Sequence, residues 1–344
     1  MPLRYGDDPY VWACWLYYED GLTQSEVADA MGVSRATVNT YLAEARDRGI
    51  INIALEPSRL AALTIADDLK RHFGLLDCLV VPSDESRPLI DRLGTAGALA
   101  MRTILQSGDR LAVAWGRTVM AVAERLAASP LQSLTDMTVV QATGSMPPTI
   151  TCTPDLCTAA FGRALLARCV NIAAPAIVGS PDLVGYLMDE PLIASAFAAL
   201  ANVNRIIFGI SSLRSNSTIH ASGFFESVSL QHYLARGAVG VLAGRFIDER
   251  GAAVEGPLDA RTIGIQLDVL ASIRTRIAVA GGFDKVPAIL ALLRGGFANV
   301  LITDAATGRG ILNADGVKAT RSRGETAPRA PIPTKMHIKK FLNR

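Results

Sequence analysis

The sequence has few of the side chains that build redox, metal or acid–base sites. Its 344 residues include five cysteines, an odd number with no C-x-x-C pair, so we expect neither a disulfide framework nor a zinc site. Of four histidines, one lies in a predicted linking helix and one in the C-terminal tail, which leaves His220 and His232 for any active site. We therefore expect a protein of a reducing compartment that uses no metal and no cofactor.

Nucleotide-binding and membrane-spanning motifs are also missing. The chain contains neither G-x-G-x-x-G nor G-x-x-x-x-G-K-[ST], which disfavours nucleotide binding. The longest uncharged run, Met137–Pro154, holds three prolines and would not cross a bilayer as a helix. The N-terminus has two acids before any apolar stretch, unlike a secretory signal. We expect a cytoplasmic protein with no membrane partner.

Aromatic residues are scarce at 6%, whereas apolar residues make up 50% and charged residues 19% of the chain. This composition is too apolar for a disordered chain and predicts an aliphatic core of the kind found in layered α/β packing. A length of 344 residues suggests two globular units.

The residues near the N-terminus carry helix signals. Tyr10–Tyr18 places Val11, Trp15 and Tyr18 on one helical face, which we expect to be buried. Thr23 and Glu26 then have the spacing of a capping box, in which each side chain satisfies a backbone amide near the other residue. A second short helix is predicted to begin there.

A tight turn and a third helix follow. Gly32 is able to take the left-handed conformation that ends a helix, and Ser34 can cap a helix that runs to about Arg48. Small Ala28, Gly32 at the turn and branched Val38 have the spacing of a helix-turn-helix, whose two helices cross closely. Short polar and basic side chains on the second helix and its neighbour are suited to reading base edges. The predicted DNA-binding residues are Gln24, Ser34, Arg35, Asn39, Thr40 and Arg46.

The charge of this segment opposes the DNA interpretation in part. Residues 1–56 carry 4 Lys/Arg against 9 Asp/Glu, a net charge of −5, although phosphate neutralisation supplies much of DNA affinity. A cluster of cations on one face, and a dimer that reads two half-sites, would offset this. The alternative is a generic helical hairpin at the edge of a larger domain.

The rest of the chain divides by composition. Gly49–Leu55 alternates weakly and suits a wing-like strand, and Pro57 then breaks the chain. Residues 314–344 carry 8 Lys/Arg against 2 Asp/Glu and have no helical periodicity, so a basic disordered tail is predicted. The predicted segments are a helix-turn-helix domain at 1–56, a linking helix at 57–75, an effector-binding and oligomerisation domain at 76–313, and the tail at 314–344.

Beyond residue 75, apolar runs of strand length alternate with helical stretches. This βαβ pattern predicts a mainly parallel sheet flanked by helices. Ligands of such sheets bind at the carboxyl ends of the strands. The predicted strands are Cys78–Val81, Leu111–Trp115, Thr138–Gln141, Val170–Ala173, Ile206–Ile210, Ile277–Ala280 and Val300–Thr303.

Three polar, glycine-bearing loops follow predicted strands. Gly116, Arg117 and Thr118 precede a helix and together form an anion cradle, in which Arg supplies a bidentate charge and the helix its positive end. Gln141–Ser145 suits a hydroxyl-rich ligand, and Gly281–Lys285 places a lysine in a first helical turn, where an anion would offset its charge. Each loop alone is more often a packing feature, but three at one sheet edge predict a pocket for a phosphorylated polyol.

The ordered set of motifs resembles the SorC family of sugar-responsive bacterial transcription regulators over residues 8–313. The resemblance rests on the helix-turn-helix and on the runs Val113–Thr118, Ala173–Ala176, Gly237–Gly240, Ala280–Lys285 and Leu301–Asp304. Within the family, the chain most resembles the erythritol-catabolism repressors.

The resemblance implies an effector domain similar to glucosamine-6-phosphate deaminase and ribose-5-phosphate isomerase, in a tetramer built as a pair of dimers. It implies that the phosphate binds at Gly116–Thr118 and that the sugar contacts the loops at Gln141–Ser145 and Gly281–Lys285. Some relatives carry a Schiff-base lysine in the loop matching Gln141–Ser145; none is present in this loop, so reversible binding is expected. Many relatives also have an aspartate where this chain has Val241. The implied effector contacts are Gly116, Arg117, Thr118, Gln141, Thr143, Gly144, Glu226 and Lys285.

Two functions remain open from the residues. The first is a transcription regulator, in particular a repressor, that binds operator DNA under control of a phosphorylated sugar or polyol. The second is a sugar-phosphate isomerase or deaminase with an added helical domain. That chemistry needs a positioned general base, and the sequence is poor in candidates beyond His220, His232 and Asp284. The regulator is therefore the favoured function.

Overall fold

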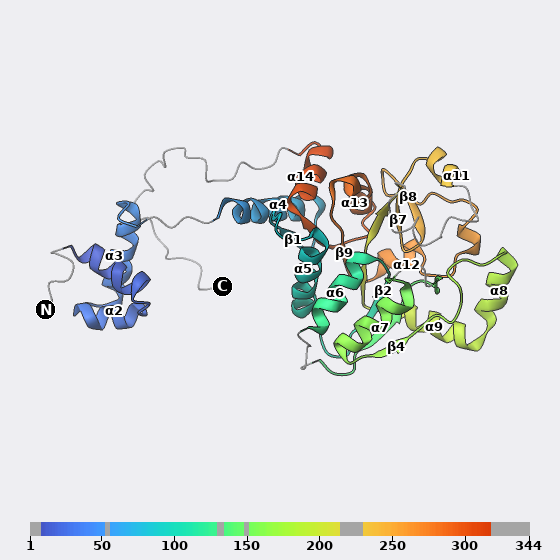
Figure 1. Ribbon diagram of the computed structural model, residues 1–344, viewed down its shortest axis with the longest axis horizontal. Coiled ribbons are helices and arrows are strands. Elements are labelled where there is room, and N and C mark those ends of the chain that lie inside the picture. Colours follow the sequence, from blue (N-terminus) through green and yellow to red (C-terminus); the bar gives the residue numbers. More distant parts are fainter. Residues whose placement is uncertain (1–7, 52–55, 129–133, 148–150, 214–229, 318–344) are drawn as a thin grey trace, which may run out of the picture. The chain divides into compact units, whose positions relative to one another are not determined.

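A computed structural model describes residues 8–51, 56–128, 134–147, 151–213 and 230–317 (Figure 1). The chain divides into two compact units, residues 1–56 and residues 57–344. Each unit has hydrophobic clusters of its own. The segment predicted to link two domains, as helix α4 (Pro57–Phe73), belongs to the second unit.

All the regular secondary structure in the described part of the first unit is helical. It consists of α1 (Pro9–Cys14), a π-helix (Trp15–Glu19), α2 (Gln24–Met31) and α3 (Arg35–Asp47). The helices enclose one core cluster, whose buried members are Ala13, Cys14, Val27, Ala28, Met31, Val38, Leu42 and Ala45.

Two details of this unit differ from expectation. The buried face of the first helical stretch carries Ala13 and Cys14, whereas Trp15 and Tyr18 are 40% and 42% exposed. Val11 is half-buried, but the prediction of burial was wrong for Trp15 and Tyr18: the buried face is already at Ala13 and Cys14 in α1, and the wider turn of a π-helix begins at Trp15. Of the predicted wing, residues 49–51 form no strand, and residues 52–55 lie outside the described part of the chain.

The second unit is built on a seven-stranded parallel sheet, which confirms the predicted fold class. All seven predicted strands belong to it: Thr138–Gln141 has the predicted ends, and the ends of the others shift by at most three residues. In spatial order they are β1 (Asp77–Val81), β10 (Val300–Asp304), β9 (Thr275–Val279), β5 (Arg205–Phe208), β2 (Arg110–Val113), β3 (Thr138–Gln141) and β4 (Arg168–Val170).

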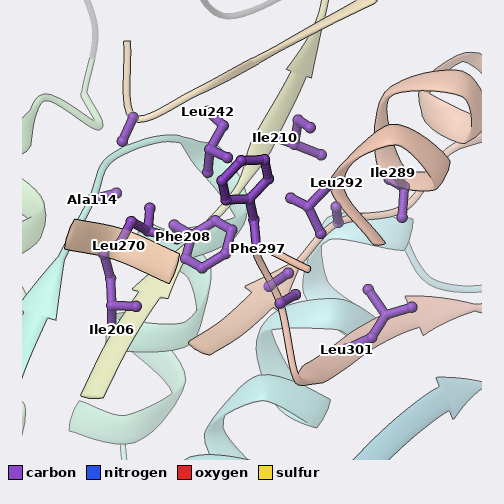
Figure 2. Close-up of a cluster of buried hydrophobic side chains, with 14 of the residues drawn as sticks. Ala114, Ile206, Phe208, Ile210, Leu242, Leu270, Ile289, Leu292, Phe297 and Leu301 are labelled. Carbon is purple, nitrogen blue, oxygen red and sulfur yellow. The ribbon is translucent and has the colours of Figure 1, made fainter. Parts of the chain in front are cut away.

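Helices cover both faces of this sheet, so successive residues of a strand pack on opposite sides. Ile206 and Phe208 belong to one core cluster, and Ile207 between them belongs to the other. Figure 2 shows part of the first cluster, in which Phe208 and Phe297 are the aromatic members among aliphatic side chains such as Ile206, Leu242 and Leu292. One face is covered by α5 (Leu89–Ile104), α6 (Arg117–Ala127) and α7 (Pro154–Leu165). The other is covered by α4, α9 (Pro191–Ala201), α13 (Val286–Arg294) and α14 (Ala305–Ala314).

A small antiparallel sheet lies beside the large one and was not predicted. It consists of β6 (Ile210–Ser212), β7 (Ala238–Leu242) and β8 (Arg245–Asp248). The turn between β7 and β8 places Ala243 and Gly244 at positive φ, as a two-residue hairpin requires. Within the described residues, the remaining helices are α8 (Pro181–Asp189), α11 (Leu230–Ala235), α12 (Leu267–Ser272), and 3-10 turns at Asp259–Arg261 and Phe283–Lys285.

Among the described residues, no single helix has the length and apolarity needed to cross a membrane; only the pair α8 and α9, bent by 88°, meets both conditions together. Across the same residues, no group of three or more His, Cys, Asp or Glu side chains is placed to hold a metal ion. All five cysteines are free thiols.

Candidate functional site

The turn between α2 and α3 has the geometry of a helix-turn-helix. The Thr23 N–H donates to Glu26 Oε2 at 2.7 Å, and the Glu26 N–H donates to Thr23 Oγ1 at 3.3 Å, so the predicted capping box is present. Gly32 ends α2 in the left-handed conformation, with φ 68°. Ala28 and Val38 meet in the core on the two sides of this turn. The spacing that predicted the motif therefore reflects a close helix crossing.

The predicted base-reading residues have different surroundings. Arg35, Asn39 and Thr40 are exposed along α3. Arg35 Nε donates to Gln24 Oε1 at 3.4 Å, which joins the two helices at their outer surface. Ser34 Oγ accepts the Thr37 N–H at 3.1 Å and so acts as a helix cap. Arg35 and Asn39, the usual readers of guanine and adenine, are thus presented to solvent side by side.

The other cations of α3 lie toward its C-terminal end. Arg46 is exposed, and its Nε donates to the Leu42 carbonyl oxygen at 3.2 Å. Arg48 forms an ion pair with Glu44 at 2.8 Å and stacks on Tyr10 at 4.1 Å. Arg48 therefore stabilises the packing of the first unit, which leaves Arg35 and Arg46 as the cations placed along the exposed side of α3.

A cavity of about 330 Å³ opens at the carboxyl edge of the parallel sheet in the second unit. The loops after β2, β5 and β9 line it, together with the first turn of α5 and the β7–β8 hairpin. Its polar wall contains Gly116, Arg117, Thr118, Ser211, Ser212, Asp284 and Lys285, and its apolar wall contains Leu89, Ile90, Leu93, Ile210 and Val241. The predicted loops at 116–118 and 281–285 thus meet at one cavity.

The N-terminus of α6 faces this cavity without a side-chain cap. Gly116 is the N-cap residue at φ 126° and ψ 167°, a conformation that favours glycine. No side chain accepts a hydrogen bond from this helix end. The first N–H groups of a helix lack partners within the helix, and they carry its positive end. The local geometry therefore suits an anion.

Thr118 holds the two cavity loops together. Its Oγ1 donates a hydrogen bond of 2.9 Å to the carbonyl oxygen of Val279, the last residue of β9. A Cβ on Gly209 would lie 3.2 Å from Thr118 Oγ1 and 3.6 Å from the Val279 carbonyl oxygen, so glycine leaves room for this contact. Since the hydroxyl hydrogen is already used, Thr118 can donate to a ligand only through its backbone N–H.

Lys285 and Arg117 place two positive charges at the cavity. Burial lowers the pKa of the Lys285 amine below its ordinary value of 10.5, the charge of Arg117 lowers it further, and Asp284 raises it. Ser212 Oγ donates to Asp284 Oδ2 at 3.4 Å. Two cations that disfavour one another when the cavity is empty would both be stabilised by an anion between them.

The third predicted loop does not line this cavity. Gln141 Nε2 donates to the Thr143 carbonyl oxygen at 2.6 Å, and both side chains are completely buried. A Cβ on Gly144 would lie 2.7 Å from the Ala174 carbonyl oxygen and 2.6 Å from that of Pro175. The loop is covered by neighbouring backbone, and its glycine is needed for that close packing. Glu226 and His220 lie outside the described residues.

Sequence reasoning missed most of the apolar wall and the serines after β5. Leu89 and Ile90 belong to a helix with ordinary amphipathic spacing, and Ser211 and Ser212 belong to the unpredicted β6. Only Val241 had been singled out, and it does line the cavity. Of the two candidate bases within the described residues, Asp284 lines the cavity and His232 does not.

Comparisons with known proteins cover nearly the whole chain. A sugar-binding domain family matches residues 59–313, and region 4 of sigma-70, a helix-turn-helix segment, matches residues 15–48. The transcriptional regulator YjhU of Escherichia coli K12 is 34% identical over 90% of this chain and 95% of its own length. The transcriptional regulator LsrR of Enterobacter sp. strain 638 is 30% identical over 87% of this chain and 90% of its own length.

A solved structure gives the same assignment. The full-length sorbitol operon regulator SorC of Klebsiella pneumoniae superimposes with a TM-score of 0.69 at 26% identity, over 88% of this chain and 97% of that one. These relatives are transcriptional regulators, which agrees with the favoured function and not with the enzyme alternative. The chain belongs to the SorC family of sugar-binding transcriptional regulators, with a DNA-binding helix-turn-helix followed by an α/β sugar-binding domain.

Proposed function

We propose that this regulator represses a sugar or polyol catabolic operon and is controlled by a phosphorylated effector in the cavity at the carboxyl edge of the sheet. The observation that carries the proposal is the convergence of Arg117, Lys285 and the uncapped N-terminus of α6 on one cavity. A phosphoryl group is the anion that such a combination of charge and backbone N–H groups favours.

The effector contacts in this proposal are fewer than the sequence suggested. Gly116, Arg117, Thr118 and Lys285 would bind the phosphoryl end, and Ser211, Ser212 and Asp284 would contact hydroxyl groups. Gln141, Thr143 and Gly144 would act only as support behind the sheet edge. A phosphorylated tetritol, as in erythritol catabolism, and a phosphorylated hexitol, as the name of the sorbitol operon regulator suggests, are the two effectors to compare first.

Operator binding would use the exposed side of α3 in a homo-oligomer. Gln24, Ser34, Arg35, Asn39, Thr40 and Arg46 remain the proposed DNA-contacting residues. A single helix-turn-helix with a net charge of −5 over residues 1–56 has little electrostatic affinity for DNA. Two heads that read two half-sites would supply it, and a tetramer would be a pair of such dimers.

The test is a thermal-shift and calorimetric comparison of phosphorylated and unphosphorylated tetritols, pentoses and hexitols on the full chain. Stabilisation by phosphorylated compounds alone is expected. Arg117→Ala and Lys285→Met should each weaken binding about ten-fold or more, because each removes a charged hydrogen-bond donor. Arg163→Ala is the matched control, since Arg163 is exposed on α7 and does not line the cavity. Equal binding of unphosphorylated compounds would reject the phosphoryl site.

A further inference from the structure

The N-terminus of α14 is hydrogen-bonded to the cavity loop, defined as Gly281–Lys285. The Gly282 N–H donates to Thr307 Oγ1 at 2.8 Å and to Asp304 Oδ2 at 3.1 Å. Thr307 Oγ1 in turn donates to Asp304 Oδ2 at 2.6 Å. Asp304 and Thr307 are buried and do not line the cavity. One backbone N–H of the cavity loop is thus held by two side chains of the next strand and helix.

A second contact joins the middle of α14 to the same loop. A Cβ on Gly310 would lie 2.9 Å from Val286 Cγ2 and 3.3 Å from Phe283 Cε2. Phe283 belongs to the cavity loop, and Val286 begins α13 directly after it. Because glycine brings α14 so close to both side chains, a displacement of the loop cannot leave α14 in place without a steric clash or a gap.

The opposite side of α14 packs on α4. A Cβ on Gly308 would lie 2.7 Å from Ile65 Cγ2 and 3.2 Å from Leu69 Cδ1, so the helices approach as closely as glycine permits. At the other end of α4, His72 Nε2 lies 2.6 Å from Asp315 Oδ2, one residue after α14. Arg294 of α13 donates to the other oxygen of the same carboxylate at 3.0 Å. The C-terminal half of α4, from Ile65 to His72, is therefore attached to α14 and to the residue that follows it.

Helix α4 is also the element through which the chain enters the second unit. Pro57, its first residue, is the first residue of that unit, and the helix-turn-helix unit ends at Glu56. A conformational change that travels from the cavity to the DNA-binding unit along the polypeptide chain must therefore pass through α4.

We propose that α14 couples the cavity to α4, with Thr307 as the positioning residue that makes α14 follow the cavity loop. The inference rests on the proposed function of the cavity. An anion that binds Lys285 displaces the cavity loop. The Gly282 N–H of this loop is hydrogen-bonded to Thr307 and Asp304, so α14 moves with it. Ile65 and Leu69 of α4 pack against α14 and are displaced in turn. Buried, close-packed contacts of this kind have discrete arrangements and do not deform continuously, which is what a two-state signal requires.

The test is hydrogen–deuterium exchange of the full chain with and without inorganic phosphate, the smallest probe of the anion site. In the wild type, phosphate should slow exchange in residues 116–120 and in the cavity loop, and should also change exchange in α4 by about five-fold or more. Thr307→Val removes the nearer of the two acceptors of the Gly282 N–H, and the hydroxyl that donates to Asp304 Oδ2, at nearly constant volume. In this variant the change at residues 116–120 should remain and the change in α4 should disappear.

Two further variants separate coupling from stability. Thr307→Ser keeps the hydroxyl group and should keep the α4 response. Thr158→Val is the matched control, because Thr158 is also fully buried in a helix, and its hydroxyl bonds only to the Pro154 carbonyl oxygen of α7. A merely structural role of Thr307 would speed exchange equally with and without phosphate and would leave the difference in α4 intact.

The outcomes distinguish this inference from the function on which it rests. If phosphate protects neither residues 116–120 nor the cavity loop, the anion site is rejected and the coupling with it. If phosphate protects both loops but leaves α4 unchanged, or if Thr307→Val keeps the full α4 response, the anion site stands and the coupling through α14 is rejected.

Discussion

The side chains of Arg117 and Lys285 come from loops after β2 and β9, two strands separated in the sheet by β5, and both line the same cavity. Their charges interact strongly enough that Arg117 contributes to lowering the pKa of the Lys285 amine, after the larger effect of burial. Asp284 acts in the opposite direction and raises this pKa, and an anion bound between the two cations would raise it as well.

Anion binding at the cavity should therefore weaken at alkaline pH earlier than an ordinary lysine would allow. The Lys285 amine must be protonated to attract the anion, and its pKa lies below 10.5, so affinity should fall as pH rises toward that value. Calorimetric titration of inorganic phosphate over a pH series measures this. An arginine at this position stays charged over the same pH range, so Lys285→Arg should abolish the fall in phosphate affinity. If the affinity of this variant still falls, the titrating group is not Lys285.

Loss of the Arg35 side chain should weaken operator binding without changing oligomerisation. Arg35→Ala removes the cation best placed on the exposed side of α3, at an expected cost of about 1–3 kcal/mol if it reads a base. Fluorescence anisotropy with promoter fragments from the gene's own locus measures the affinity, and light scattering checks the assembly. Arg163→Ala in the second unit serves as a control, and unchanged affinity of Arg35→Ala would remove this residue from the interface.

The capping box at the start of α2 should contribute measurably to the stability of the first unit. Thr23→Ala removes the Oγ1 acceptor of the Glu26 N–H and should lower the free energy of unfolding by about 1 kcal/mol. Thermal unfolding followed by tryptophan fluorescence in a Trp115→Phe background reports this unit, because Trp12 and Trp15 are then the remaining tryptophans. Thr23→Ser retains the cap and should unfold like the wild type; equal loss in both variants would show that the methyl group matters instead.

The stability of the second unit should decline in acid partly through Asp315. The hydrogen bond with His72 lowers the pKa of this carboxyl below 3.8, Arg294 lowers it further, and burial partly offsets both. A lowered folded-state pKa adds stability that is present above the unfolded value and is lost as pH falls through the folded one. Asp315→Asn should be less stable than the wild type in urea at neutral pH, and the difference should shrink as pH falls toward 3.8 and below. A difference independent of pH would mean that shape and not charge is lost.

The parallel sheet was predictable because most of its strands contain a short apolar run; the exception is β4, Arg168–Val170, which is mostly exposed. In β5, for example, Ile206, Ile207 and Phe208 are all buried, as expected for a strand covered on both faces. The small sheet escaped prediction because β6 has only three residues and β7 contains Gly240, whose missing side chain leaves space for Ala288.

The cavity was predictable only in part. The rule that ligands bind at the carboxyl ends of parallel strands identifies the edge, and Gly116–Thr118 and Lys285 do lie there. The same rule does not say which loops another segment covers. Gln141–Gly144 follows a strand of the same sheet, but backbone of Ala174, Pro175 and Gly264 packs over it.

Local chemistry along the chain was sufficient to determine the helix-turn-helix and the positions of the seven strands along the sequence. Helix caps such as Thr23 and Ser34 bond to a backbone N–H three residues further on, and a buried strand is recognised from consecutive apolar side chains, so both signals are local in the sequence. Tertiary structure alone decided which charges share the cavity and how α14 lies between the cavity loop and α4. Those relationships depend on the order in which strands pair, and on glycines such as Gly308 that admit a close approach, so no pattern within one segment contains them.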